Sequence, residues 1–345
     1  MAKTMRAARG REPGRIELEE VPVPTPGEGE VLLRVNHCGI CGSDLHWFHG
    51  GIPVPNVCPG HEIAATVAEA GRGVSGVKAG DRVTLEGIRT CGRCEYCRSS
   101  DYELCRNLGM IGMTIPGGFA DYLLTTERHL FPIPSAVDDE VAQLTEPLAV
   151  SVHAVRLAGV SIGQRVLVLG AGTIGLTAIT AARHGGAGEI LVTARRPQQR
   201  AAASALGATK VFDPADGGEL MSYCFDHPVD VVIETVGDAN SSLNDAIACV
   251  RPGGTVAVLG VFTQAPMLNA LFLMMKEVRL IGSMCYGRRD GRADFDVALD
   301  ILAREGETLR RHMITHRFPL DRIQEGFAAA NDKSSGSIKV SISAR

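Results

Sequence analysis

The chain has 345 residues, of which 45% are hydrophobic and 21% charged, and its net charge is −4. This composition is typical of a globular protein with room for two domains, and it excludes a disordered chain. A slightly acidic chain has no bulk attraction for nucleic acid or for anionic lipid, so we expect neither nucleic-acid nor membrane partners.

The amino-terminal segment is charged and lacks the apolar run of a secretory signal. The most apolar stretches, 166–169 and 268–275, are too short to cross a bilayer. We therefore expect a cytoplasmic protein.

Residues 1–150 are rich in Pro, Gly, Cys and His, and short alternating runs such as 31–35 predict short strands joined by turns. Residues 151–287 alternate between strands and helices instead. The predicted strands are 165–169, 189–194, 229–234, 255–260 and 278–283, and the predicted helices include 174–184, 200–206, 241–250 and 270–275. This alternation predicts an α/β domain with a parallel sheet covered on both faces. Beyond 288 we predict a helix at 293–305, a strand at 312–318, a helix at 320–330 and a strand at 337–343.

Four cysteines within a short segment have the spacing C-x2-C-x2-C-x7-C: Cys91, Cys94, Cys97 and Cys105. The two-residue gaps let successive thiolates converge on one ion, and a closed set of four sulfur ligands is typical of a structural zinc. A chance cluster of buried thiols or a disulfide pair is the alternative interpretation.

A second set of candidate ligands is spread over three segments: Cys41, His61, Glu62 and Glu146. Each alone is a weak signal, because a lone cysteine is usually a small core residue. Together they offer a thiolate, an imidazole and carboxylates. Such a mixture is typical of a catalytic zinc that keeps one position open.

A glycine-rich G-x-G-x-x-G motif follows the predicted strand 165–169 and opens a helix: Gly170, Gly172, Thr173, Ile174 and Gly175. The glycines permit a tight turn and close approach of the backbone to a pyrophosphate, which the helix N-terminus then faces. In this strand–turn–helix context the motif predicts a dinucleotide site, whereas a plain glycine-rich turn is the alternative.

The end of the second predicted strand of this region lacks the acidic residue that usually binds the ribose of NAD. Glu189 begins that strand and lies at its other end, whereas Ala194, Arg195 and Arg196 come at its carboxyl end, followed by Arg200. Guanidinium groups bind phosphate through paired charge-assisted bonds, so we predict NADP(H) in preference to NAD(H). A solvated basic loop is the alternative.

In their order and spacing, GICGSDLH, PGHE, the four cysteines, TEPLAVSVHA and VLGAGTIGL resemble the zinc-dependent medium-chain dehydrogenase/reductase family over nearly the whole chain. The most similar branch is that of the polyol, butanediol and threonine dehydrogenases. The resemblance implies a GroES-like catalytic domain, residues 1–150 and 288–345, and a doubly wound Rossmann domain, residues 151–287.

The resemblance also implies roles for residues. Cys41, His61 and Glu62 match zinc ligands, and Glu146 would bind the metal directly or hold its water. The resemblance therefore does not decide whether Glu62 or Glu146 binds the zinc directly in the resting enzyme. Ser43 and His46 match the positions of a proton relay.

At two positions the sequence differs from related enzymes, and both differences bear on the class of substrate. Glu146 stands where alcohol dehydrogenases of the better-known type have a second cysteine, which favours the polyol and diol branch. Cys285-Tyr286 replaces an Arg-Tyr pair of the sorbitol dehydrogenases, and this favours a smaller secondary alcohol, vicinal diol or hydroxyketone.

We therefore expect a zinc-dependent, NADP-linked oxidoreductase that interconverts a small secondary alcohol, diol or polyol with its ketone by hydride transfer. It would hold one catalytic and one structural zinc. An NAD-dependent polyol or threonine dehydrogenase and a catalytically silent, cofactor-binding relative stay open as alternatives. The apolar segments 268–275 and 278–284 suggest a subunit interface in a homodimer or homotetramer. The alternative is that they are an internal helix and strand of one chain.

Overall fold

The computed structural model describes residues 3–237 and 241–344. The chain divides into two compact units, one formed by Met1–Glu146 with Gly287–Arg345 and the other by Pro147–Tyr286. Within the described residues, no helix has both the length and the hydropathy that a membrane crossing requires.

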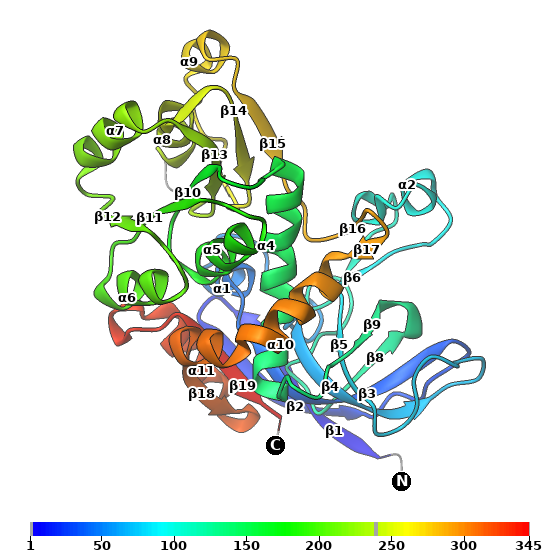
Figure 1. Ribbon diagram of the computed structural model, residues 1–345. Coiled ribbons are helices and arrows are strands. Elements are labelled where there is room, and N and C mark those ends of the chain that lie inside the picture. Colours follow the sequence, from blue (N-terminus) through cyan, green and yellow to red (C-terminus); the bar gives the residue numbers. More distant parts are fainter. Residues whose placement is uncertain (1–2, 238–240, 345) are drawn as a thin grey trace. The chain divides into compact units, whose positions relative to one another are not determined.

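The second unit is a six-stranded parallel sheet with the order β12-β11-β10-β13-β14-β15. Its strands are β10 (Arg165–Leu169), β11 (Glu189–Thr193), β12 (Lys210–Phe212), β13 (Val229–Glu234), β14 (Val250–Val258) and β15 (Arg279–Gly282). The helices of this unit are α4 (Thr145–Ala158), which begins at the end of the first unit, α5 (Thr173–His184), α6 (Pro197–Ala205), α7 (Gly217–Asp226), α8 (Ser242–Cys249) and α9 (Ala270–Met275). α5 and α6 lie on one face of the sheet and α7 and α8 on the other (Figure 1). The predicted doubly wound parallel sheet is therefore confirmed.

Some predicted elements of this unit need correction. Strand β12 was not among the predicted strands, because three residues are too few to show a periodic pattern. α6 begins at Pro197, earlier than the predicted residue 200, since proline is well suited to the first turn of a helix. β14 begins at Val250, five residues before the predicted start, although its first residues include Pro-Gly-Gly.

Two glycines shape the turn between β10 and α5. Gly170 has a φ of +96°, which an L side chain rarely adopts. A Cβ on Gly175 would lie 2.0 Å from the carbonyl oxygen of Gly170, so only glycine lets the helix approach the turn this closely. These two residues hold the predicted dinucleotide motif in a strand–turn–helix arrangement.

The first unit is built on a seven-stranded sheet with the order β18-β19-β3-β4-β5-β9, and β8 pairs with β3. Its strands are β3 (Glu30–Gly39), β4 (Glu62–Ala70), β5 (Arg82–Leu85), β8 (Tyr122–Thr126), β9 (Leu130–Pro132), β18 (Ile314–Pro319) and β19 (Lys339–Ser343). Among the described strands of this sheet, β18 and β19 pair in parallel and the other pairs are antiparallel. Buried residues such as Leu33, Ile63 and Val83 fill the core beneath it.

Three strand pairs and five helices complete the first unit in the described part of the chain. The two-stranded pairs are β1 (Thr4–Glu12) with β2 (Arg15–Pro22), β6 (Ile88–Arg89) with β7 (Gly109–Met110), and β16 (Arg288–Arg289) with β17 (Arg292–Ala293). The α-helices are α1 (Gly42–Phe48), α2 (Glu95–Arg98), α3 (Asp139–Ala142), α10 (Asp294–Met313) and α11 (Ile323–Asn331). The GroES-like, β-rich character predicted for this part of the chain is confirmed.

The end of α10 also differs from the prediction. The helix continues to Met313 instead of ending at 305, because Leu302, Leu309 and Met313 extend one buried face through Gly306. The following strand, β18, accordingly begins at Ile314 and not at 312. α11 begins at Ile323, after a 3-10 turn at Leu320–Arg322, and β19 begins at Lys339 instead of 337.

The close approach at Gly175 makes a testable prediction about the second unit. Gly175→Ala should lower the free energy of unfolding by about 1–3 kcal/mol, because the added methyl group has no room. Gly172→Ala is the matched control, since a Cβ there meets nothing within 4 Å and its φ of −77° suits alanine. Urea denaturation of the cofactor-free proteins measures both, and equal stabilities would contradict the packing argument.

Candidate active site

The four cysteines predicted to bind a structural zinc converge in the first unit, and the segment that carries them, residues 91–105, is called the lobe below. Cys94 precedes the short helix α2 and Cys97 lies within it, while Cys91 and Cys105 flank the segment. Their Sγ atoms all lie within 4.8 Å of one another, and the closest pair, Cys94 and Cys97, is 3.5 Å apart. All four are free thiols, so the disulfide alternative does not hold. Four sulfur atoms at these separations fit a closed tetrahedral zinc site.

The backbone of the lobe favours thiolates. N–H groups of Arg93 and Cys94 point at Cys91 and lower the pKa of its thiol to about 6. Backbone N–H groups of Cys97 and Arg106 lower the pKa of Cys94 as well. Burial and the thiols of Cys94 and Cys105 raise the pKa of Cys97 to about 11. A divalent cation would relieve the repulsion between these sulfur atoms, so the lobe is suited to bind one.

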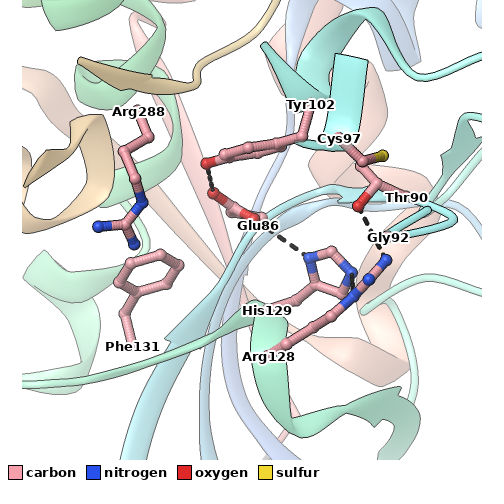
Figure 2. Close-up of a pocket in the computed structure, with 9 residues that line it drawn as sticks. All are labelled: Glu86, Thr90, Gly92, Cys97, Tyr102, Arg128, His129, Phe131 and Arg288. Carbon is pink, nitrogen blue, oxygen red and sulfur yellow. Dashed lines mark hydrogen bonds and ion pairs between the residues drawn. The ribbon is translucent and has the colours of Figure 1, made fainter. Parts of the chain in front are cut away.

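A buried polar network attaches this lobe to the sheet. Glu86 accepts hydrogen bonds from the Tyr102 hydroxyl and from Nδ1 of His129, the latter at 3.1 Å (Figure 2). Arg128 donates to Nε2 of His129 at 3.0 Å and to Oγ1 of Thr90 at 2.8 Å. With Nε2 accepting from Arg128, Nδ1 is the ring nitrogen that donates to Glu86. Thr90 and Tyr102 lie close to the first and last cysteines of the lobe, so the network fixes both of its ends.

The second set of candidate ligands begins at Cys41, between β3 and α1. The backbone N–H of Cys41 donates to Oδ2 of Asp44 at 3.0 Å, and this bond anchors the first turn of α1. Asp44 is 3% exposed, and burial raises the pKa of its carboxyl group. Asp44 therefore orients the backbone at Cys41.

His61 immediately precedes β4 and lies beside Cys41 and Ser43. Its Nε2 is 3.4 Å from Oγ of Ser43, and its ring also makes a side-chain hydrogen bond with Cys41. Burial alone would lower the pKa of His61, but the charges of Cys41, Asp44 and Glu146 raise it well above its usual value. The ring thus lies in a strongly anionic environment, as a cation site requires.

Glu146 lies in the first turn of α4 and is 6% exposed. Burial is the main cause that raises the pKa of its carboxyl group to about 7, and Glu62 adds to it, whereas His61 opposes it. Within the described part of the chain, this carboxylate accepts no hydrogen bond. Glu146 therefore belongs to the cluster and has its oxygen atoms available.

Glu62, the first residue of β4, is in a different situation. Both of its carboxylate oxygens lie 2.6 Å from Nζ of Lys339, and both side chains are 1% exposed. Sequence reasoning missed Lys339, whose only signal was a lone lysine in an otherwise apolar or small-residue strand. Among the described residues, the four lobe cysteines are the set whose ligand atoms all lie within 4.8 Å of one another. The ligand atoms of Cys41, His61, Glu62 and Glu146 are farther apart than this.

His46 lies one helical turn after Ser43 on α1 and is half-buried. Residues three apart are neighbours on a helix surface, so the two predicted relay residues share one face of α1.

In the second unit, the predicted cofactor residues gather at the carboxyl ends of the strands. Gly172 caps α5, whose first residues are Thr173 and Ile174, and the backbone N–H of Gly170 donates to Oγ1 of Thr193 at 2.8 Å. A pocket here is lined by residues that include Leu169, Thr193 and Arg195. Parallel α/β sheets bind nucleotides at this edge.

The three arginines after β11 differ in their surroundings. Arg195 is exposed and lines the pocket, Arg196 caps α6, and Arg200 forms an ion pair of 2.5 Å with Asp213. Ala194 is buried. Glu189, the first residue of β11, pairs with Arg165 and therefore lies at the opposite end of the strand.

Comparison with known proteins agrees with this arrangement. Residues 27–135 match the alcohol dehydrogenase GroES-like domain and residues 173–304 match the zinc-binding dehydrogenase domain. The chain is 32% identical to a sorbitol dehydrogenase of Bacillus subtilis (strain 168), covering 99% of this chain and 97% of the relative. It is 35% identical to an L-threonine 3-dehydrogenase of Mesorhizobium japonicum, with 95% of each chain covered.

Solved structures show the same similarity. A zinc-binding dehydrogenase of Sinorhizobium meliloti 1021, bound to NADP, superposes with a TM-score of 0.89 at 33% identity, with 99% of each chain covered. For 2R,3R-butanediol dehydrogenase from Bacillus subtilis the TM-score is 0.87 at 29% identity, with 99% of this chain and 100% of that chain covered. The chain therefore belongs to the zinc-dependent medium-chain dehydrogenase/reductase family of alcohol dehydrogenases, which are oxidoreductases acting on CH–OH groups.

Proposed function

We propose that this protein is a zinc-dependent, NADP-linked dehydrogenase that interconverts a small secondary alcohol, diol or polyol with its ketone. The observation that carries the proposal is the grouping of the half-buried Cys41 and His61 with the buried Glu146, in which the negative charges of Cys41 and Glu146 both act on the His61 ring and would favour a divalent cation. The names of the relatives support the substrate class, since sorbitol, threonine and butanediol each carry a secondary hydroxyl beside another polar group.

The donor set of this cluster fits zinc. Cys41 offers a thiolate, His61 an imidazole nitrogen and Glu146 a carboxylate, which are the ligand types of catalytic zinc sites. Three protein ligands leave one position for a substrate oxygen. When bound, the zinc would supply Lewis acidity toward the alcohol oxygen, and NADP would supply the hydride acceptor.

The protein side chains would handle the proton. Ser43 Oγ, beside the His61 ring, can accept the proton of the alcohol hydroxyl and donate its own. His46, one turn further along α1, can accept that proton on its imidazole and release it to water. Asp44 holds the start of α1 in place while this transfer occurs.

The preference for NADP rests on the end of β11. No carboxylate follows Thr193 in the sequence Ala194-Arg195-Arg196, so this segment itself does not repel a 2′-phosphate. Arg195 is the first candidate contact, because it is exposed beside the pocket, whereas Arg200 is already paired with Asp213. The relative from Sinorhizobium meliloti bound to NADP supports this preference.

Self-association of this chain is part of the proposal, as a homodimer or a homotetramer. β15 is the edge strand of the six-stranded sheet, and the neighbouring helix α9 exposes apolar side chains. The exposed fractions are 59% for Leu271, 65% for Met274 and 66% for Met275. An open strand edge beside an apolar patch is a typical protein interface.

Metal content tests the two zinc sites. We expect two zinc ions per chain in the wild-type protein, and one in Cys94→Ser, which should also lose about 3 kcal/mol or more of stability. His61→Gln should lose the other ion and lower kcat/KM at least about a thousandfold, with a smaller effect on stability. Cys285→Ser is the control that keeps both ions. A fully metal-free protein that retains turnover would refute the proposal.

Cofactor preference is tested with a panel of diols, polyols, threonine and ketones, followed through the absorbance of the reduced nicotinamide. Arg195→Ala should lower kcat/KM for NADP about 10- to 100-fold, because a charge-assisted phosphate contact is lost, and should leave NAD nearly unchanged. Arg304→Ala, an exposed arginine of α10, is the control. Equal or better turnover with NAD in the wild type would favour the NAD-dependent alternative, and no turnover with any substrate would favour the silent relative.

Light scattering tests the proposed subunit interface. The wild-type protein should be at least a dimer, and Met274→Asp should raise its dissociation constant about a hundredfold or more, because a charge would be buried in an apolar contact. Phe225→Asp, at an exposed apolar residue of α7, should leave the assembly intact. A monomeric wild type would exclude this part of the proposal.

A further inference from the structure

Two buried cysteines of the second unit contact each other between α7 and α8, which lie on the same face of the sheet (Figure 1). Cys224 lies near the end of α7 and Cys249 is the last residue of α8, and their side chains are hydrogen-bonded to each other. Cys224 is 6% exposed and Cys249 2%. The Sγ atom of Cys249 also lies 3.6 Å from Sδ of Met221 on α7. These thiols belong to neither candidate zinc site.

The surroundings of the pair favour a thiolate at Cys224. The hydrogen bond from Cys249 is the main cause that lowers the pKa of Cys224, and the positive charges of Arg165 and Lys276 lower it further, whereas burial opposes them. The same hydrogen bond raises the pKa of Cys249, and burial adds to it. The ammonium of Lys276 is held nearby, because it donates to two carbonyl oxygens in the last turn of α8, at 2.8 Å each. Since the thiolate is the reactive form of cysteine, Cys224 is the nucleophile of the pair.

The pair lies one helical turn from the pocket at the carboxyl ends of the strands. This pocket has a volume of about 310 Å³, and its wall includes Leu220 of α7 and Asp245 of α8. Residues four apart lie on the same face of a helix. Cys224 is therefore the next residue beyond Leu220 on its face of α7. Cys249 is likewise the next residue beyond Asp245 on its face of α8.

Met221 connects the pocket with the two thiols. Its half-buried side chain lines the pocket, and its sulfur atom contacts Cys249. A molecule as small as hydrogen peroxide that enters the pocket is therefore one side chain away from the pair. Large oxidants are excluded, because both thiols are buried.

We propose that Cys224 and Cys249 are a redox modification site, at which a hydroperoxide converts the two thiols into a disulfide between α7 and α8. The Cys224 thiolate attacks one peroxide oxygen, so that an S–O bond forms and the O–O bond breaks. The departing oxygen takes a proton and leaves as water or as an alcohol. The sulfur of Cys249 then attacks the sulfenic acid, so that the S–S bond forms and the S–O bond breaks, and the hydroxide leaves as water with the proton of Cys249. Two thiols lose two electrons and two protons in total, and the peroxide gains them.

The disulfide would act on the pocket through both helices. It restricts the two side chains to a narrow range of geometries, so the ends of α7 and α8 can no longer adjust to each other. The pocket residues one turn away on each helix are then held in the arrangement of the oxidised protein. We therefore expect oxidation to weaken nucleotide binding, and this consequence rests on the dinucleotide site proposed above.

The wild-type protein with its lobe zinc bound tests the cross-link directly. After treatment with a small excess of hydrogen peroxide, a non-reducing digest should contain two peptides joined through Cys224 and Cys249, and dithiothreitol should separate them. In Cys249→Ser, Cys224 should stop at the sulfenic acid, which dimedone traps, whereas Cys224→Ser should show no trapped Cys249. A wild type in which both thiols stay reduced would overturn the proposal, whether or not other cysteines oxidise.

The effect on the pocket is measured through the fluorescence of bound NADPH. The cross-linked wild type should bind NADPH at least about fivefold more weakly than the reduced protein, and dithiothreitol should restore the affinity. Cys224→Ser treated with peroxide should keep its affinity. Cys285→Ser is the matched control, because it removes a half-buried cysteine that also contacts a methionine sulfur, and it should behave as the wild type does. An unchanged affinity in fully cross-linked protein would refute the effect on the pocket.

Failure of the dinucleotide site and failure of the modification site are distinguishable. If the reduced wild type binds neither NADPH nor NADH, the dinucleotide site of the proposed function is wrong, and the peptide digest still decides whether the disulfide forms. If NADPH binds and no cross-link forms, the dinucleotide site stands and the modification site is wrong.

Discussion

Charge balance in one buried cluster is the constraint on which the candidate site depends. The carboxylates of Asp44, Glu62 and Glu146 are buried and the thiol of Cys41 beside them is half-buried, in surroundings where unpaired anions are unfavourable. Glu62 is offset by Lys339, and Asp44 accepts the N–H of Cys41. Cys41 and Glu146 are left to share the His61 ring, and a divalent cation would satisfy them both. Residues of the protein thus balance two of the carboxylates, and the remaining negative charge of the cluster is what a bound cation would neutralise.

The two candidate zinc sites differ in how the chain constructs them. The lobe takes its four sulfur atoms from a single short segment, and a polar network through Glu86 and His129 ties both ends of that segment to the sheet. The cluster takes its donors from the ends of separate elements, since Cys41 follows β3, His61 precedes β4 and Glu146 opens α4. A closed set from one loop is typical of a structural ion, and a set assembled by the fold is typical of a catalytic one.

This difference explains what the sequence could and could not predict. The lobe, the glycine motif and the strands β10 and β11 carry local signals, namely fixed spacings and apolar runs, and the structure has them close to where they were expected. β12 was missed because three residues hold no period, and the true end of α10 was missed because burial continues through Gly306. The pairing of Lys339 with Glu62 joins residues far apart in the chain, so it depends on the register of β19 and β3. No local pattern encodes that register, and sequence alone therefore left the choice between Glu62 and Glu146 open.

The position of Lys339 has a consequence for biosynthesis. The first unit is formed by two stretches of chain that flank the second unit, and β19 belongs to the later stretch. On the ribosome, Cys41, His61 and Glu146 emerge long before Lys339, so the nascent chain carries an uncompensated Glu62 for much of its synthesis. Such a chain would offer both carboxylates to any divalent ion that it meets. The buried surroundings of the candidate site would then be completed late, only when the distal strand β19 pairs with β3.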